Sequence, residues 1–218
     1  MGKVLKYRRN LRLDNNREGT VMDCKMYRNL VLDAKQKANG IEDMPARARE
    51  ILDYFKIKDF KGGVPIVEIL RKFGFKIFQS DLKPEGLSAY IAVDPKFEEV
   101  FESNKITCVH VEDNVGHKRF ALAHELAHYL FDFNENKNLY YYDTYFPQNE
   151  EDSFIEKRAN QFAANLLMPE KEFREMFEKY RQTNGKADTV NALGNYFAVS
   201  PTAVLKRFKE LKIDGYDN

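Results

Sequence analysis

The chain has 218 residues, of which 43% are hydrophobic, and its 35 Lys and Arg are balanced by 34 Asp and Glu. This is the composition of an ordinary globular protein, and so small a net charge does not argue for nucleic acid or a membrane surface as a partner. No apolar run approaches the roughly 20 residues of a membrane span, and residues 1–16 lack the apolar stretch of a signal peptide, so we expect a cytoplasmic protein. Cys24 and Cys108 are the two cysteines, which does not favour a disulfide framework and cannot supply a thiolate cage for zinc.

Three regions follow one another along the sequence. Residues 1–40 form a basic N-terminal extension with some helical periodicity, which Asn39 and Gly40 end. Residues 41–182 carry the largest number of structural signals, and residues 183–218 form a C-terminal helical region. Helices are expected at 46–55, 64–73, 120–131 and 152–167, and strands at 75–79, 87–93 and 105–111. This order of helices, small sheet and further helices is typical of the α+β class.

The stretch RFALAHELAHYLF (119–131) places two histidines and a glutamate in an apolar helical pattern. His124 and His128 are four apart, so an α-helix presents them on one face, where they can bind one metal ion. Glu125 lies about 100° round the helix from His124, where its carboxylate can hold a water beside that metal. This is the H-E-x-x-H geometry, in which two histidines bind zinc and the glutamate is the general base. The alternative is a buried histidine pair satisfied by hydrogen bonds.

A catalytic zinc site needs a third protein ligand, and the helix expected at 152–167 offers one. Glu156 and Asn160 are four apart on it and can face the same site. Glu156 can bind zinc while Asn160 holds the far side of a ligand histidine. The alternative is that Glu156 is an exposed helix residue. The rival ligands are acidic residues at the helix start, where the helix dipole favours negative charge: Glu150, Glu151 and Asp152.

The two stretches together, RFALAHELAHYLF and IEKRANQFAANLLMP, resemble the paired motifs of the ImmA/IrrE family of bacterial and phage metallopeptidases. The resemblance covers about residues 41–182, and Ala127 stands where the family usually has glycine. It implies a minimal zincin-like domain of the gluzincin type and a zinc endopeptidase that cleaves a helix-turn-helix repressor of a phage, a mobile element or a stress response. The site residues that it implies are three zinc ligands and a general base: His124, His128 and Glu156 for zinc, and Glu125 as the base.

The C-terminal stretch TVNALGNYFAVSPTAVLKRFKEL matches the packing pattern of a helix-turn-helix, with Ser200 as N-cap and Pro201 in the first helical position. DNA binding is one interpretation, but Pro201, Thr202 and Ala203 offer base edges no suitable side chain, so we do not expect direct nucleic acid binding. The other interpretation is that these helices pack on the peptidase domain or recognise a protein partner.

Two functions from different classes therefore remain. The first is the zinc endopeptidase, and the alternative is a DNA-binding or partner-binding regulator with a non-catalytic metal site. Glu125 favours the first, because a structural zinc needs no base. For the peptidase we expect residues 86–93 (GLSAYIAV) to supply an open sheet edge for an extended substrate. The candidates for stabilising the oxyanion stay open: Tyr140, Tyr141, Tyr142, Tyr145 and His117.

Overall fold

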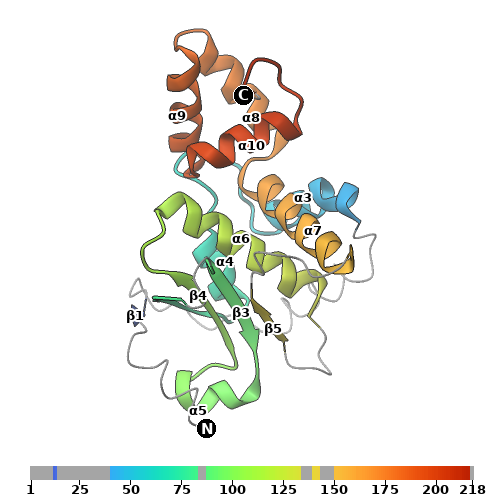
Figure 1. Ribbon diagram of the computed structural model, residues 1–218, viewed down its shortest axis with the longest axis vertical. Coiled ribbons are helices and arrows are strands. Elements are labelled where there is room, and N and C mark those ends of the chain that lie inside the picture. The colour runs from blue at the N-terminus through green and yellow to red at the C-terminus, as the bar shows by residue number, and fades with distance from the viewer. Residues whose placement is uncertain (1–11, 14–39, 83–86, 134–138, 143–149, 217–218) are drawn as a thin grey trace.

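The computed structural model describes residues 12–13, 40–82, 87–133, 139–142 and 150–216, and for 12–13, 139–142 and 150–152 it describes the backbone alone. The helical pattern expected before residue 40 lies outside these ranges. The architecture is α+β, as predicted: a mixed sheet lies at one end, two long helices cross the middle, and three helices form the other end (Figure 1). No helix in the described part of the chain combines the length and the apolar character needed to cross a membrane.

The sheet has five strands in the order β1-β2-β4-β3-β5. β2 (Lys76–Ser80) runs parallel to β4 (Lys105–His110), whereas β3 (Ala89–Val93) runs antiparallel to β4. The short strands β1 (Arg12–Leu13) and β5 (Leu139–Tyr142) form the two edges, both antiparallel to their neighbours. The three strands predicted from sequence are therefore the three central ones, each shifted or shortened by one or two residues at its ends.

Alternation along the strands gives the sheet two apolar faces, because successive side chains point to opposite sides. On β2, Ile77 belongs to the large core between the sheet and the helices, whereas Phe78 belongs to a smaller cluster. That smaller cluster includes Phe97 and Phe101, which come from a 3-10 turn (Pro95–Phe97) and the short helix α5 (Glu98–Phe101). The helices therefore cover one face of the sheet, and α5 covers part of the other (Figure 1).

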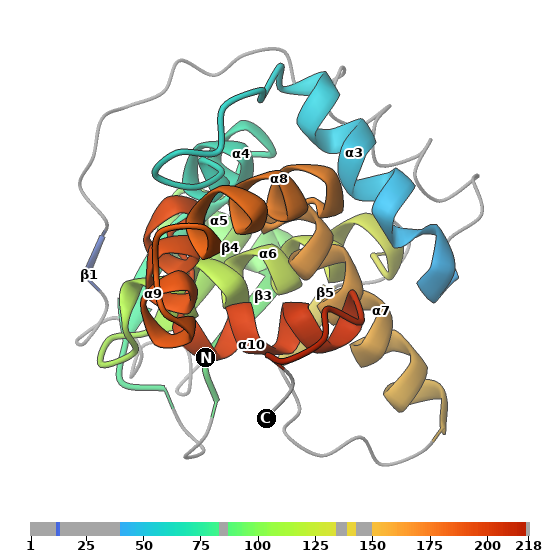
Figure 2. The same ribbon diagram turned by 90° about the horizontal axis from the view of Figure 1, so that it is seen from above.

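Helix α6 (Val115–Phe131) is the central element, and its residues 121–131 are all buried. The side chain of Asn114 caps it by accepting a hydrogen bond from the backbone N–H of His117 at 2.9 Å. Seen from above, α8, α9 and α10 lie over α6, and α3 lies to one side (Figure 2). The other helices are α3 (Met44–Tyr54), α4 (Ile66–Lys72), α7 (Glu150–Leu167), α8 (Glu170–Arg181), α9 (Lys186–Phe197) and α10 (Pro201–Glu210).

The expectation that residues 86–93 supply an open edge is wrong. β3 pairs with β4 on one side and with β5 on the other, from residue 89 or 90 to residue 93. No strand was expected in the tyrosine-rich segment after α6, although Leu-Tyr-Tyr-Tyr at 139–142 is rich in residues that favour strands. This segment forms β5 and occupies the edge that was expected to be free.

The C-terminal helices pack directly on α6. A Cβ atom placed on Gly116 would lie 2.5 Å from the backbone nitrogen of Ser200, so the start of α6 and the turn before α10 are in backbone contact. Arg119 Nε donates to the carbonyl of Ala198 at 2.9 Å, and its Nη2 donates to the carbonyl of Val64 at 2.5 Å. The side chain of Ser200 caps α10 and Pro201 takes the first position, as predicted. The division of the chain at residues 182 and 183 stays a prediction.

Candidate metal centre

Helices α6 and α7 pack against each other (Figure 1). The two histidines of the H-E-x-x-H stretch lie on the side of α6 that faces α7, because both are close to Glu156. Their i, i+4 spacing places the rings one turn apart in an edge-to-face arrangement, with centroids 4.7 Å from each other. The two Nε2 atoms point at one another and are 2.9 Å apart. His124 is 4% exposed and His128 is 0% exposed, so both imidazoles are withdrawn from solvent.

Glu156 reaches the same point from α7. Its Oε2 lies 3.1 Å from His124 Nε2, and its Oε1 lies 3.6 Å from His128 Nε2. One ligand atom from each of these residues lies within 4.8 Å of the others, and no other group of His, Cys, Asp or Glu in the described residues meets this criterion. Two imidazole nitrogens and a carboxylate are the donor set of a His₂Glu zinc site. The structure therefore brings together the three residues predicted as ligands.

The outer nitrogen of each imidazole is held by an oxygen. His128 Nδ1 lies 2.9 Å from Asp132 Oδ2, and His124 Nδ1 lies 3.3 Å from Asn160 Oδ1. A carboxylate or amide oxygen can only accept, so each Nδ1 carries the hydrogen and donates it. The inner Nε2 of each neutral imidazole is then left with a lone pair directed at the centre. Asn160 thus lies behind His124, one of the two histidines predicted as ligands, and its supporting role stays a prediction.

This arrangement fits a divalent cation. Two Nε2 lone pairs and the carboxylate of Glu156 converge, and all three groups are acceptors. Burial lowers the pKa of His128, which favours the neutral imidazole that a metal ion requires. A cation at the centre would satisfy all three acceptors at once, whereas a single proton would satisfy one pair. The chemistry of the donor set therefore matches the zinc expected from sequence.

Glu125 is 0% exposed and lies between the two histidines in the sequence of α6. A carboxylate is costly to bury unless its surroundings compensate, so its presence in this apolar helix calls for a polar or charged neighbour. Its assignment as base stays a prediction. The rival ligands Glu150, Glu151 and Asp152 lie in the first turn of α7, where only the backbone is described.

Sequence analysis missed two residues that support the centre. Asp132 follows α6 as its C-terminal cap residue, holds His128 through Oδ2, and forms an ion pair with Arg158 through Oδ1. Arg158 stands two residues beyond Glu156 on α7 and is 6% exposed. The i, i+4 spacing of His128 and Asp132 was a signal available in the sequence, but the Arg158 contact depends on how α6 and α7 pack.

Of the candidates for stabilising the oxyanion, His117 alone has a side chain that the structure describes. His117 lies at the start of α6, exposed, with its Nε2 2.9 Å from Ser88 Oγ. Tyr140, Tyr141 and Tyr142 lie on β5, whose side chains are outside the description, and Tyr145 lies outside the described residues. Cys108 is fully buried on β4, and burial raises the pKa of its thiol to about 12, which suits a structural role.

The family model described as the IrrE N-terminal-like domain, a peptidase family, matches residues 70–209. The chain belongs to this peptidase family. The matched residues include α6 and α7 with the whole candidate centre, and the resemblance to the ImmA/IrrE family seen in the sequence is confirmed.

Other comparisons bear on the fold. A solved structure of a Mycobacterium tuberculosis transcriptional regulator matches 90% of this chain at 17% identity, with a TM-score of 0.52. The match covers 54% of that regulator, so this chain corresponds to about half of it. At this identity the likeness shows a shared fold. The comparison with curated proteins gave no match.

Proposed function

We propose that this peptidase-family chain is a zinc-dependent endopeptidase, with His124, His128 and Glu156 as zinc ligands and Glu125 as the general base. The observation that carries the proposal is the convergence of three acceptor groups whose outer partners are already in place. A structural zinc usually has four protein ligands and needs no base beside it. Three ligands and a buried glutamate next to the first histidine are the requirements of a hydrolytic site.

The protein's own groups would each have one task in peptide hydrolysis. When bound, zinc supplies Lewis acidity, which polarises the scissile carbonyl and lowers the pKa of water from 15.7 towards about 7. Glu125 accepts a proton from the attacking water and returns it to the leaving amine nitrogen. Asn160 and Asp132 keep the two imidazoles in the tautomer that directs Nε2 inward. Burial of both histidines excludes bulk water from their side of the site.

We propose a regulatory protein as substrate, namely a helix-turn-helix repressor of a phage, a mobile element or a stress response, cleaved in the cytoplasm. The support is the family to which the chain belongs, together with the paired motifs on α6 and α7. Hydrolysis of a repressor is an irreversible way to relieve repression.

The decisive experiment is co-expression with repressors encoded beside the gene. The expected result is a fragment pair, located by mass spectrometry, that forms with the natural chain and not with Glu125→Gln. The same repressor is then incubated with purified chain, with and without a chelator, to show that cleavage is direct and needs metal. Cleavage that persists in Glu125→Gln or in excess chelator would contradict the proposal.

A further inference from the structure

A cavity of about 560 Å³ opens between α6, α7 and α10. We call it the α10 groove. It begins beside the metal centre, because Asn160, the residue that holds His124 Nδ1, lines it together with His117. It ends at α10, where Thr202, Lys206 and Glu210 form the opposite wall. The groove therefore connects the candidate site with the C-terminal helices.

The lining combines an apolar surface with unbalanced positive charge. Phe120, Ala164 and Met168 supply apolar area. Lys157 and Lys206 are both exposed, and neither forms an ion pair with a described side chain. The one carboxylate among the lining residues, that of Glu210, is already engaged: its Oε2 accepts from Arg207 Nη1 at 3.0 Å, and its Oε1 accepts from Gln161 Nε2 at 3.1 Å.

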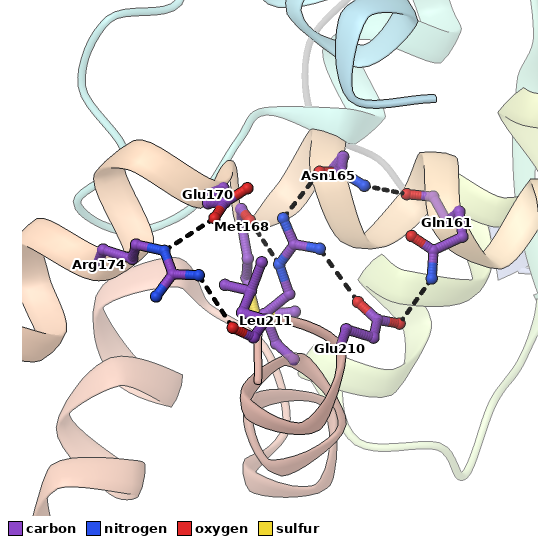
Figure 3. Close-up of polar contacts among 8 residues, drawn as sticks. Gln161, Asn165, Met168, Glu170, Arg174, Glu210 and Leu211 are labelled. Carbon is purple, nitrogen blue, oxygen red and sulfur yellow. Dashed lines mark hydrogen bonds and ion pairs between the residues drawn. The ribbon is translucent and has the colours of Figure 1, made fainter. Parts of the chain in front are cut away.

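The wall formed by α10 is held in place by a buried arginine. Arg207 is 2% exposed, and besides Glu210 it has two partners on the α7 side. Its Nη2 donates to Asn165 Oδ1 at 2.8 Å, and its Nε donates to the carbonyl of Met168 at 3.1 Å. Figure 3 shows Asn165, Met168 and Glu210 around this point, with Gln161 joined to both Asn165 and Glu210. These contacts hold α10 against the end of α7, so two walls of the groove are fixed relative to each other.

The position of α10 also explains what its first turns do. In a DNA-binding helix-turn-helix, the first residues of the second helix face the major groove of DNA. Here Thr202, Ala203 and Lys206 from these turns line the α10 groove instead. Their side chains are small or cationic, which suits contact with a polypeptide that enters the groove.

We propose that the α10 groove binds the stretch of the substrate next to the scissile bond, and that it selects a segment with apolar side chains and at least one acidic residue. The inference rests on the proposed peptidase function and adds the chemistry that the substrate must carry. The apolar lining would cover the apolar side chains, and Lys157 and Lys206 would attract the carboxylate. The occupant is thus a protein segment, in keeping with the absence of base-reading side chains at the start of α10.

The test measures binding apart from hydrolysis. A random peptide library is displayed and selected on the zinc-loaded Glu125→Gln chain, which is expected to bind without cleaving. The selection is repeated with Lys157→Glu and Lys206→Glu added to that chain. The matched control adds Lys171→Glu and Lys209→Glu, which make the same change of charge at exposed positions of α8 and α10 outside the groove. Zinc content and thermal unfolding are measured for each chain.

Selected peptides should combine apolar residues with Asp or Glu, and the groove variant should replace this acidic preference with a basic one. For one selected acidic peptide, Lys157→Glu and Lys206→Glu should each weaken binding by at least about two- to fivefold, and the control substitutions should weaken it by less. An equal preference in all three chains, or no enriched peptide at all, would overturn the inference. Binding of duplex DNA that is lost with the two groove lysines would overturn it as well. Hydrolysis of the selected peptides is measured separately with the natural chain, which keeps Glu125. If the peptidase proposal fails, that chain binds the peptides without cleaving them.

Discussion

Asp132 Oδ2 lies 2.9 Å from His128 Nδ1, while its other oxygen forms an ion pair with Arg158. The carboxylate of Asp132 thus joins His128, a predicted zinc ligand on α6, to the guanidinium of Arg158 on α7. Arg158 lies two residues beyond Glu156, the predicted ligand that α7 carries. Asp132 is 9% exposed and Arg158 8% exposed in their side chains, so water screens the pair little. The relationship sets both the tautomer of His128 and the position of the two helices that form the site.

The first prediction concerns this carboxylate. Asp132→Ala should weaken zinc binding by about 10- to 100-fold, because His128 loses the group that orients its ring and raises its basicity. Affinity is measured by competition with a chromophoric chelator. Asp188→Ala, an exposed position on α9, is the control and should leave the affinity unchanged. Equal affinities for the two variants would show that Asp132 does not support the metal ligand.

The second prediction concerns the ligands themselves. The natural chain should contain one zinc per molecule by emission spectrometry, and His128→Ala and Glu156→Ala should contain far less. His110→Ala is the control, because His110 lies on β4 and its Nε2 is 3.6 Å from Asp81 Oδ1, in a separate contact. Free zinc at about 100 times its Kd should raise the free energy of unfolding of the natural chain by about 2.7 kcal/mol. A similar rise in His128→Ala would contradict the ligand assignment.

The third prediction separates the base from the ligands. Glu125→Gln should keep its zinc and its unfolding temperature, since the amide has nearly the shape of the carboxylate. It should lose about 10²- to 10⁴-fold in the rate of peptide hydrolysis, because an amide accepts no proton from water. The rate is measured on a repressor cleaved by the natural chain. If the variant cleaves at an undiminished rate, Glu125 has another role.

The site was more predictable from sequence than its surroundings, for a physical reason. His124 and His128 are brought together by the helical repeat alone, and so are Glu156 and Asn160. Local spacing therefore predicted each pair of residues on its own helix, and the resemblance to the family's paired motifs predicted that the two pairs belong to one site. The contact between Asp132 and Arg158 has no such local signal, because it depends on the angle and register at which α6 meets α7.

The strand errors have a related cause. Residues 86–93 were expected to form an open edge because of their small, polar start and the alternation of Leu87, Ala89 and Ile91, but alternation describes the two faces of a strand and not its neighbours. Whether an edge is free depends on a segment elsewhere in the chain, here Leu139–Tyr142. The short helix α5 was missed because its four residues are too few for a helical period to appear. The helices that became α3, α6, α7, α9 and α10 gave clear periods, and their existence was predicted even where their ends moved, whereas α8 (Glu170–Arg181) was not predicted.

The last prediction concerns the buried arginine that joins α10 to α7. Arg207→Ala should lower the free energy of unfolding by about 2–4 kcal/mol, because it removes three hydrogen bonds made by a buried cation and leaves the acceptors Asn165 Oδ1 and the Met168 carbonyl without that donor. Arg174→Ala is the control, since its ion pair with Glu170 and its hydrogen bond to the carbonyl of Leu211 at 2.9 Å are both exposed, and an exposed ion pair is worth at most about 1 kcal/mol.

Urea unfolding at saturating zinc measures both variants. Burial lowers the pKa of Arg207, but the guanidinium stays charged at neutral pH, so its removal takes away a cation and not a neutral group. Equal losses in Arg207→Ala and Arg174→Ala would mean that the buried contacts do not fix α10. A larger loss for Arg207→Ala with zinc affinity unchanged is the expected outcome, because the arginine holds the far wall of the α10 groove and makes no contact with the metal ligands.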